Sequence, residues 1–222
     1  MFASNTSPSR WPKRIVLGTV GIFLLVQVLI RILRRAAPEP MPSRLAPVFT
    51  TPLRSRLFGS PERILDRARV APSMRVLEVG PGPGVYTVPL ALRVASSGED
   101  GSVTCLEIQP EMIEKLRERL RAAGIGNVEV VRGDGRQMPL PEESFDMVFL
   151  VDVVGEIPDK PTFFSKCARV LKVGGTLAVT EQISDQDFRL PNTVRRLATE
   201  AGLREEGWVG LPWWTYTARF RK

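Results

Sequence analysis

The chain has 222 residues, with 31 lysines and arginines, 24 acidic residues and no histidine, for a net charge of +7. Residues 1–58 carry nine basic residues against one acid, whereas residues 59–222 carry twenty-two against twenty-three and are nearly neutral. A nucleic-acid-binding domain would concentrate the basic excess on its folded part, so this distribution argues against a nucleic-acid partner. With no histidine and two cysteines, we also predict no metal site.

The N-terminal segment is predicted to be a membrane anchor. Residues 1–14 form a basic tail, and Ile15 to Ile30 is an uncharged, strongly apolar run. Extended through Arg31 to Leu33, this run reaches nineteen residues, close to the roughly 20 needed to cross a bilayer. A cleaved signal peptide is the main alternative. Arginines stand where a small-residue cleavage site would be expected, which favours a retained transmembrane helix over residues 15–35.

Residues 36–58 are predicted to be a juxtamembrane linker or lid. Five prolines between positions 38 and 52 favour a semi-rigid spacer over a helix. Arg44, Arg54 and Arg56 add positive charge after the anchor and indicate a cytoplasmic C-terminal side. The apolar residues of this linker could pack on the following domain, or could form a lid that touches both membrane and active site.

One α/β domain is predicted over residues 59–222, a length that suits a single core. Its first helix starts at Ser60, a good N-cap residue, with Pro61 at the first helical position.

The most informative segment follows that helix. Val76 to Val79 reads as a buried strand that contains the acid Glu78, and glycines follow it at positions 80, 82 and 84. Glycine permits positive φ and lets a ligand approach the backbone closely. Residues 85–97 are predicted to form the next helix, which places the glycine turn at a helix N-terminus, where open α/β sheets bind nucleotide-like ligands.

The rest of the chain alternates between strands and helices. A strong helix begins at Pro110 and stops at Gly124. Such alternation predicts a parallel sheet with right-handed crossovers. The predicted later strands are 103–107, 128–131 and 144–151, then a strand after a Gly174-Gly175 turn within 168–180, and a final antiparallel pair over 204–209 and 213–220 that follows a helix over 191–202.

The cysteines and the late aromatic residues in these elements lead to two further predictions. Cys105 and Cys167 fall in a predicted core strand and helix, and we expect both to be buried free thiols. Large aromatic residues gather late in the chain, where they could line an apolar pocket or, as we favour, form the core at the end of the sheet. These residues are Trp208, Trp213, Trp214 and Phe220.

The pattern Glu-x-Gly-x-Gly-x-Gly from Glu78 to Gly84 resembles motif I of the class I S-adenosylmethionine-dependent methyltransferases. A dinucleotide-binding fingerprint would need a glycine at position 85, where this chain has Val85. The resemblance implies a Rossmann-like, seven-stranded, mostly parallel sheet with helices on both faces, in the order 3-2-1-4-5-7-6. Here that fold is preceded by the predicted transmembrane helix.

The resemblance also implies a cofactor, S-adenosyl-L-methionine, and its contacts. Glu107 ends the second strand and matches the acid that accepts hydrogen bonds from the ribose hydroxyls. Asp134 matches the acid that contacts the adenine amino group. The full predicted cofactor set is Glu78, Gly80, Gly82, Gly84, Glu107, Ile108, Gly133, Asp134, Gly135 and Asp152.

Candidate catalytic residues are carboxylates, because the chain lacks the commonest general base, histidine. Asp152 and Glu156 follow the fourth strand, and Glu181 ends the fifth, at the edge of the sheet that faces the ligand. Tyr86 could help to close over the cofactor or could simply pack.

The leading prediction is a membrane-anchored methyltransferase that acts on a small or amphipathic acceptor, such as a lipid, a quinone precursor or a thiol. The alternative is a membrane-anchored, cofactor-binding interaction protein without catalysis. A nicotinamide-dependent oxidoreductase is disfavoured by Val85. The acceptor atom and the oligomeric state stay open.

Overall fold

The computed structural model describes residues 59–96 and 100–222. The predicted tail (1–14), anchor (15–35) and linker (36–58) lie outside these residues. In the described part of the chain, no helix combines the length and the apolar character needed to span a bilayer.

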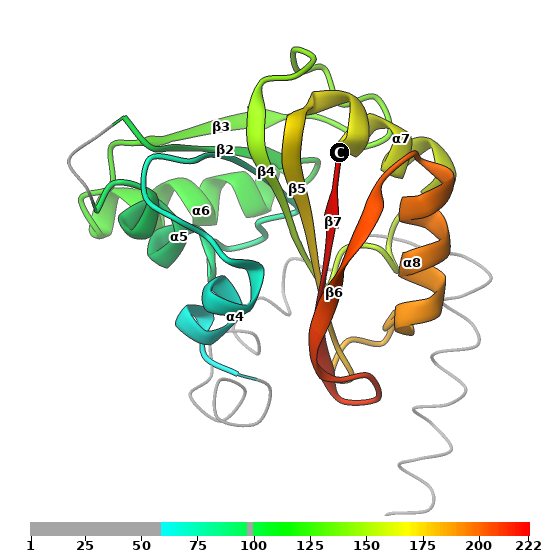
Figure 1. Cartoon of the computed structure of the whole chain (residues 1–222). Coiled ribbons are helices and arrows are strands. Elements are labelled where there is room, and N and C mark those ends of the chain that lie inside the picture. Colours follow the sequence, from blue (N-terminus) through cyan, green and yellow to red (C-terminus); the bar gives the residue numbers. More distant parts are fainter. Residues whose placement is uncertain (1–58, 97–99) are drawn as a thin grey trace, which may run out of the picture.

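A seven-stranded sheet forms the centre of the domain (Figure 1), in the order β3-β2-β1-β4-β5-β7-β6. This is the predicted order. The first five strands run parallel, and β7 pairs antiparallel with both β5 and β6. The strands are β1 (Arg75–Val79), β2 (Ser102–Glu107), β3 (Val128–Arg132), β4 (Phe145–Val151), β5 (Leu171–Gln182), β6 (Arg204–Leu211) and β7 (Thr215–Arg221).

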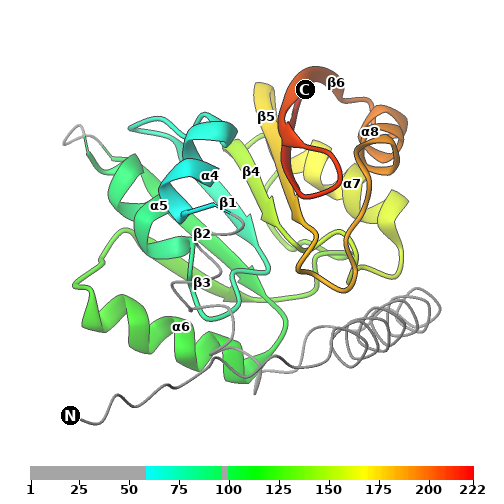
Figure 2. The same cartoon turned by 90° about the horizontal axis from the view of Figure 1, so that it is seen from below.

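Helices cover both faces of the sheet, and each face has its own core. Buried residues of α4, α5 and α6 form one core cluster with alternate residues of the strands, and those of α7 and α8 join the other. Figures 1 and 2 show α7 and α8 together on one side, away from α4 and α5. The helices are α4 (Pro61–Ala68), α5 (Thr87–Val94), α6 (Pro110–Ala122), α7 (Lys160–Val170) and α8 (Pro191–Glu200).

Local sequence signals explain where the helices start. Ser60 caps α4 and accepts a hydrogen bond from the Arg63 backbone N–H, as expected for an N-cap serine. α6 begins at Pro110 and buries Met112, Ile113, Leu116 and Leu120 along one face. The helix predicted over residues 85–97 is shorter in the structure, because the turn after β1 continues through Val85 and Tyr86.

The prediction of a Gly174-Gly175 turn between a helix and a strand was wrong. β5 begins at Leu171, directly after α7, and contains both glycines. Its register with β4 shifts between the pairs Phe145–Leu171 and Met147–Thr176, so the extra residues form a bulge. Gly174 has a φ of 76°, which explains why the sequence resembles a turn at this point.

Of the late aromatic cluster, only Phe220 is part of the core. Trp208, Trp213 and Trp214 are exposed, which contradicts the favoured core interpretation. Trp208 lies on β6, at the edge of the sheet, and the other two lie in the turn between β6 and β7, where no neighbouring strand covers them. None of the three lines the main cavity, so the pocket interpretation is also not supported. Cys105 and Cys167 are buried free thiols, as predicted.

Candidate functional site

A cavity of about 230 Å³ opens at the carboxyl ends of the parallel strands. The loops after β1, β2, β3 and β4 all contribute to its lining, which is the usual place of a ligand in an open α/β sheet. Most of the predicted site residues meet here: Gly80, Gly82, Glu107, Ile108, Gly133, Asp134, Gly135, Asp152 and Glu156.

The glycine turn forms one wall of the cavity through its backbone. Gly80 and Gly82 have φ values of 66° and 53°, in the left-handed region that side chains disfavour. The Gly80 N–H donates to the Leu106 carbonyl at 2.9 Å, which ties the turn to the end of β2. Without a Cβ at Gly80 and Gly82, the main chain at these two positions is open to a ligand.

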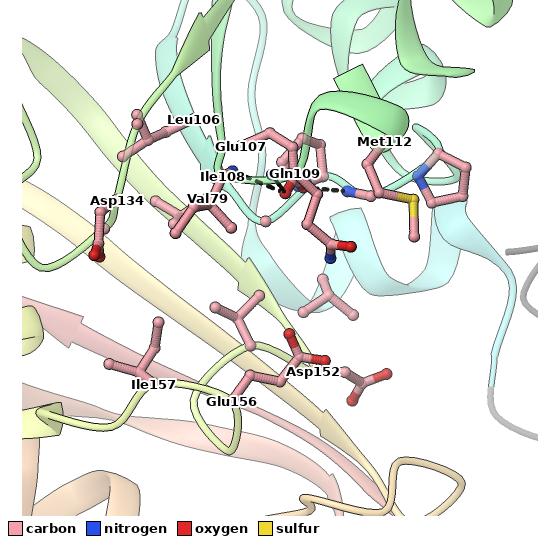
Figure 3. Close-up of a pocket in the computed structure, with 18 of the residues that line it drawn as sticks. Val79, Leu106, Glu107, Ile108, Gln109, Met112, Asp134, Asp152, Glu156 and Ile157 are labelled. Atoms are coloured by element: carbon pink, nitrogen blue, oxygen red, sulfur yellow. Dashed lines mark hydrogen bonds between the residues drawn. The ribbon is translucent and has the colours of Figure 1, made fainter. Parts of the chain in front are cut away.

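Glu107 is held in the cavity by backbone donors. Its Oε1 accepts hydrogen bonds from the backbone N–H groups of Ile108 and Gln109 at 2.8 and 2.9 Å, and its Oε2 accepts one from Gly82 at 3.2 Å. Figure 3 shows this carboxylate at the end of its strand. A carboxylate has roughly four acceptor positions, so three bonds fix its orientation and leave capacity for a ligand donor. Burial raises the pKa of Glu107, whereas the three N–H donors lower it.

Asp134 lies at another wall of the cavity and is paired with Arg136. The Arg136 guanidinium donates from Nε and Nη2 to the Asp134 Oδ2 at 2.9 and 2.6 Å, and the Arg136 backbone N–H donates to Oδ1 at 2.8 Å. The hydrogen bonds from Arg136 hold the pKa of Asp134 below its usual range. An ionised, oriented carboxylate suits recognition of an N–H donor. Arg136 was not predicted, although its spacing of two from Asp134 is a local signal for such a pair.

Asp152 and Glu156 lie on the opposite side of the cavity from Glu107 and Gln109 (Figure 3). Asp152 has a φ of 56°, an uncommon conformation for a residue with a side chain, and its Oδ1 accepts a hydrogen bond from the Gln182 N–H at 2.7 Å. Strained backbone of this kind concentrates at functional sites. The two carboxylates therefore line the part of the cavity that lies across from Glu107.

Glu181, the third predicted base, does not line the cavity. Its carboxylate is fully buried and accepts a hydrogen bond from the Arg189 backbone N–H at 2.7 Å. Burial, together with the nearby Asp152 and Asp185, raises the pKa of Glu181 well above its ordinary value. The prediction failed because the loop after β5 covers the end of that strand. No local sequence pattern indicates this covering.

Two predicted cofactor residues also lie outside the lining. The Glu78 carboxylate points below the glycine turn, where the Thr87 hydroxyl donates to it at 2.7 Å and the Cys105 thiol at 3.6 Å. Gly84 packs against α6, and a Cβ added there would lie 2.5 Å from Leu116 Cδ1. Both residues support the turn from behind, so any effect on a ligand would be indirect.

Sequence reasoning also missed cavity residues of the ordinary apolar and polar kinds. Gln109, Met112 and Ile157 line the cavity and are visible in Figure 3. Gln109 and Met112 belong to the start of α6, immediately after Glu107, so their closeness to that acid was the available signal. Tyr86 lines the cavity as well, and its hydroxyl accepts a hydrogen bond from the Gln182 side chain at 3.4 Å.

Glu78 gives the fold a pH dependence that can be measured. Burial raises its pKa from 4.5 to about 7, against the opposing hydrogen bonds from Thr87 and Cys105. Between these two values the folded state binds a proton that the unfolded state lacks, so stability is highest below the lower value and falls as the pH rises through the window. We expect Glu78→Gln to reduce the loss of unfolding free energy between about pH 5 and about pH 7.5 by roughly 2–3 kcal/mol.

Urea denaturation of both proteins at the two pH values checks this prediction. The difference between the proteins isolates Glu78, because Glu107 and Glu181 have raised pKa values and contribute to the pH dependence of both. Equal pH dependence in the wild type and Glu78→Gln would show that Glu78 is ionised in the folded state at low pH.

The middle part of the chain is similar to a known protein family. Residues 77–179 match the family model described as "Methyltransferase domain". The ubiquinone/menaquinone biosynthesis C-methyltransferase UbiE of Shewanella piezotolerans is 34% identical over 118 residues, which are 53% of this chain and 46% of the relative. The demethylmenaquinone methyltransferase of Geobacillus kaustophilus is 31% identical over 120 residues, 54% of this chain and 50% of the relative.

The match therefore spans about half the length of these curated relatives. Among solved structures, one described as a SAM dependent methyltransferase from Aquifex aeolicus has a TM-score of 0.73 at 24% identity. The alignment covers 82% of this chain and 98% of that chain, so the two share the fold over most of this chain.

Proposed function

We propose that this chain is an S-adenosylmethionine-dependent methyltransferase with a small, quinone-type aromatic acceptor. The observation that carries the proposal is the position of Glu107, a buried carboxylate held by three backbone N–H groups at the rim of the cavity. The family match over residues 77–179 and the names of the relatives support the same activity.

The residues of the cavity fit S-adenosylmethionine. Glu107 would hold the ribose hydroxyls, the Gly80–Gly82 backbone would leave room for the amino-acid portion, and Asp134 would accept from the adenine amino group. Apolar side chains suit the two faces of an adenine ring, and the cavity offers Leu106, Ile108 and Met112. Bound there, S-adenosylmethionine supplies an activated methyl group, so the protein's main task is to align donor and acceptor and to exclude water.

Asp152 and Glu156 are the candidates for proton transfer on the acceptor side. Methylation of an aromatic carbon needs an electron-rich ring, and removal of a proton from a ring hydroxyl supplies it. A cavity carboxylate would take that proton, and the ring carbon would then take the methyl group as its bond to sulfur breaks and S-adenosylhomocysteine leaves. The hydrogen on that carbon would pass to the solvent as a proton, which restores the aromatic ring. Asp152 Oδ1 accepts a hydrogen bond from the Gln182 N–H, and we take Glu156, which lines the same side of the cavity, as the base.

The location of the enzyme belongs to the same proposal. Residues 15–35 would anchor the chain in a membrane with the domain on the cytoplasmic side, where S-adenosylmethionine is made. An apolar quinone precursor would then meet the enzyme at the bilayer. A reporter thiol introduced in the domain and labelled from outside intact cells would contradict this orientation.

The test is S-adenosylhomocysteine formation by the full chain with a reduced demethylmenaquinone-type hydroquinone in detergent. We expect product in the wild type and roughly 100-fold less in Glu156→Gln, the size of a lost general base. The matched control is Glu142→Gln, an exposed acid that does not line the cavity. Cofactor binding without product on hydroquinone, phenol, lipid or thiol acceptors would instead support the non-catalytic, cofactor-binding alternative.

A further inference from the structure

The hairpin formed by β6 and β7 has an apolar tip. Residues 207–218 contain no charged residue and include three tryptophans. Five of their side chains are exposed, and we refer to them as the hairpin surface: Trp208 (40%), Val209 (45%), Leu211 (50%), Trp213 (64%) and Trp214 (39%). Monomeric proteins seldom expose this many large apolar side chains at one place without a function for them.

The hairpin surface includes both faces of β6. Successive side chains of a strand point to opposite faces, so Trp208 and Val209 face opposite ways although both are exposed. Trp213 and Trp214 continue the exposed surface into the turn, whereas Thr215 to Ala218 of β7 are buried inside the sheet. A flat partner covers only one face of an edge strand. An apolar edge strand that is exposed on both faces is buried by immersion in a surrounding medium.

Tryptophan favours one such medium in particular. Its ring is apolar and its indole N–H needs a polar partner, so tryptophan is enriched where bilayer hydrocarbon meets the headgroups. The polar edge of the hairpin lies farther back, where Arg221 pairs with Glu206 at 2.9 Å. The charge distribution therefore divides the hairpin into an apolar tip and a polar base.

The tip lies at the same end of the strands as the cavity, namely the carboxyl ends of the parallel strands. Thr215 pairs with Gln182 at the end of β5, and the Gln182 N–H in turn donates to Asp152 of the cavity. In Figure 1 the turn between β6 and β7 lies at the lower end of the sheet, towards which the start of α4 also points. Arg219 of β7 donates to the Arg67 carbonyl at 2.7 Å, which fixes α4 beside the hairpin. The described part of the chain thus begins on this side of the domain.

We propose that the hairpin surface inserts into the headgroup region of a lipid bilayer and holds the mouth of the cavity against the membrane. The basic excess of residues 1–58 favours anionic lipid, so both elements would act on one surface. This inference concerns docking and does not require that the enzyme's acceptor is a quinone.

A nitroxide spin label on the full chain in phosphatidylcholine–phosphatidylglycerol vesicles tests the proposal. The label is attached at Leu211→Cys or, as the matched control, at Val173→Cys. Val173 is an 80% exposed apolar residue near the start of β5, so it lies at the other end of the strands from the hairpin tip. Cys105 and Cys167 are buried, so the introduced thiol reacts selectively.

We expect the label at position 211 to gain access to oxygen and to lose access to a water-soluble nickel complex when vesicles are present, whereas the label at position 173 stays accessible to nickel. Adding Trp213→Ser should reduce the change at position 211. Equal nickel access at both positions overturns the proposal. Shielding at position 211 without lipid, with spin–spin broadening, overturns it in favour of a second copy of the chain.

The readout is separable from catalysis. Calorimetric titration of S-adenosylhomocysteine into Trp213→Ser should give the wild-type affinity, because Trp213 does not line the cavity. A chain that fails to form product with every acceptor but still inserts its hairpin would refute the proposed function and retain this inference.

Discussion

Glu107→Gln is expected to weaken S-adenosylhomocysteine binding by roughly tenfold to a hundredfold, the range for hydrogen bonds to a charged group. Glutamine matches glutamate in shape but replaces one acceptor oxygen with an N–H₂ donor. In the structure, three backbone N–H groups point at this carboxylate, from Gly82, Ile108 and Gln109. Whichever way the amide turns, at least one donor faces another donor, and the negative charge is lost.

Isothermal titration calorimetry of the full chain in detergent measures this effect. Glu111→Gln is the matched control, because Glu111 is an exposed acid in the first turn of α6, four residues from Glu107, and does not line the cavity. Unchanged affinity in Glu107→Gln, with a folded protein, would contradict the assignment of Glu107 as the ribose-binding residue and would remove the main support for the proposed function.

The arrangement of the sheet could be predicted because it depends on signals along the chain. Alternation of apolar strands and amphipathic helices determines a parallel sheet, and the resemblance supplied its order. Glu107 and Asp134 were assigned from the resemblance, and Asp152 from the rule that the carboxyl ends of parallel strands meet at one side of the sheet. All three acids line the cavity, because each lies at or just after the end of a parallel strand.

Other positions depend on packing between distant segments, which the sequence does not display. Glu78 and Glu107 are both acids at or near the end of an apolar strand. Glu107 lines the cavity, whereas Glu78 points under the turn towards Thr87 and Cys105. Glu181 follows the same rule as Asp152, but the loop after β5 covers it. The tryptophans were assigned to the core because they are large aromatic residues near the last strands, but Trp208 lies on an edge strand and the other two lie in a turn, where they are exposed.

The glycines of the turn show that one motif can combine two separate demands. Gly84 has a φ of 78°, and an added Cβ would lie 2.5 Å from Leu116 Cδ1 in the core. Gly82 has a φ of 53°, but an added Cβ meets no described atom within 4 Å and Gly82 lines the cavity. Gly84 therefore serves packing, and Gly82 keeps space for a ligand.

Alanine at the two positions should accordingly affect different properties. We expect Gly84→Ala to lower the free energy of unfolding by about 2–5 kcal/mol, from roughly 1–2 for left-handed backbone and about 1–3 for overpacking. Gly82→Ala should cost only the backbone part, about 1–2 kcal/mol, and should weaken S-adenosylhomocysteine binding because its methyl group enters the ligand's space. Urea denaturation and calorimetry measure the two quantities on the same preparations.

Each variant is the control for the other, since both place alanine at positive φ in the same turn. Leu116→Ala removes the Cδ1 atom that the added methyl group would meet. Gly84→Ala should therefore cost less unfolding free energy in a Leu116→Ala background than in the wild type, although Leu116→Ala itself loses core contacts. Equal losses of stability in Gly82→Ala and Gly84→Ala would show that backbone strain alone decides the cost. Unchanged affinity in Gly82→Ala would mean that the cofactor does not approach this part of the turn, and the cofactor would have to bind farther along the cavity, towards Asp134.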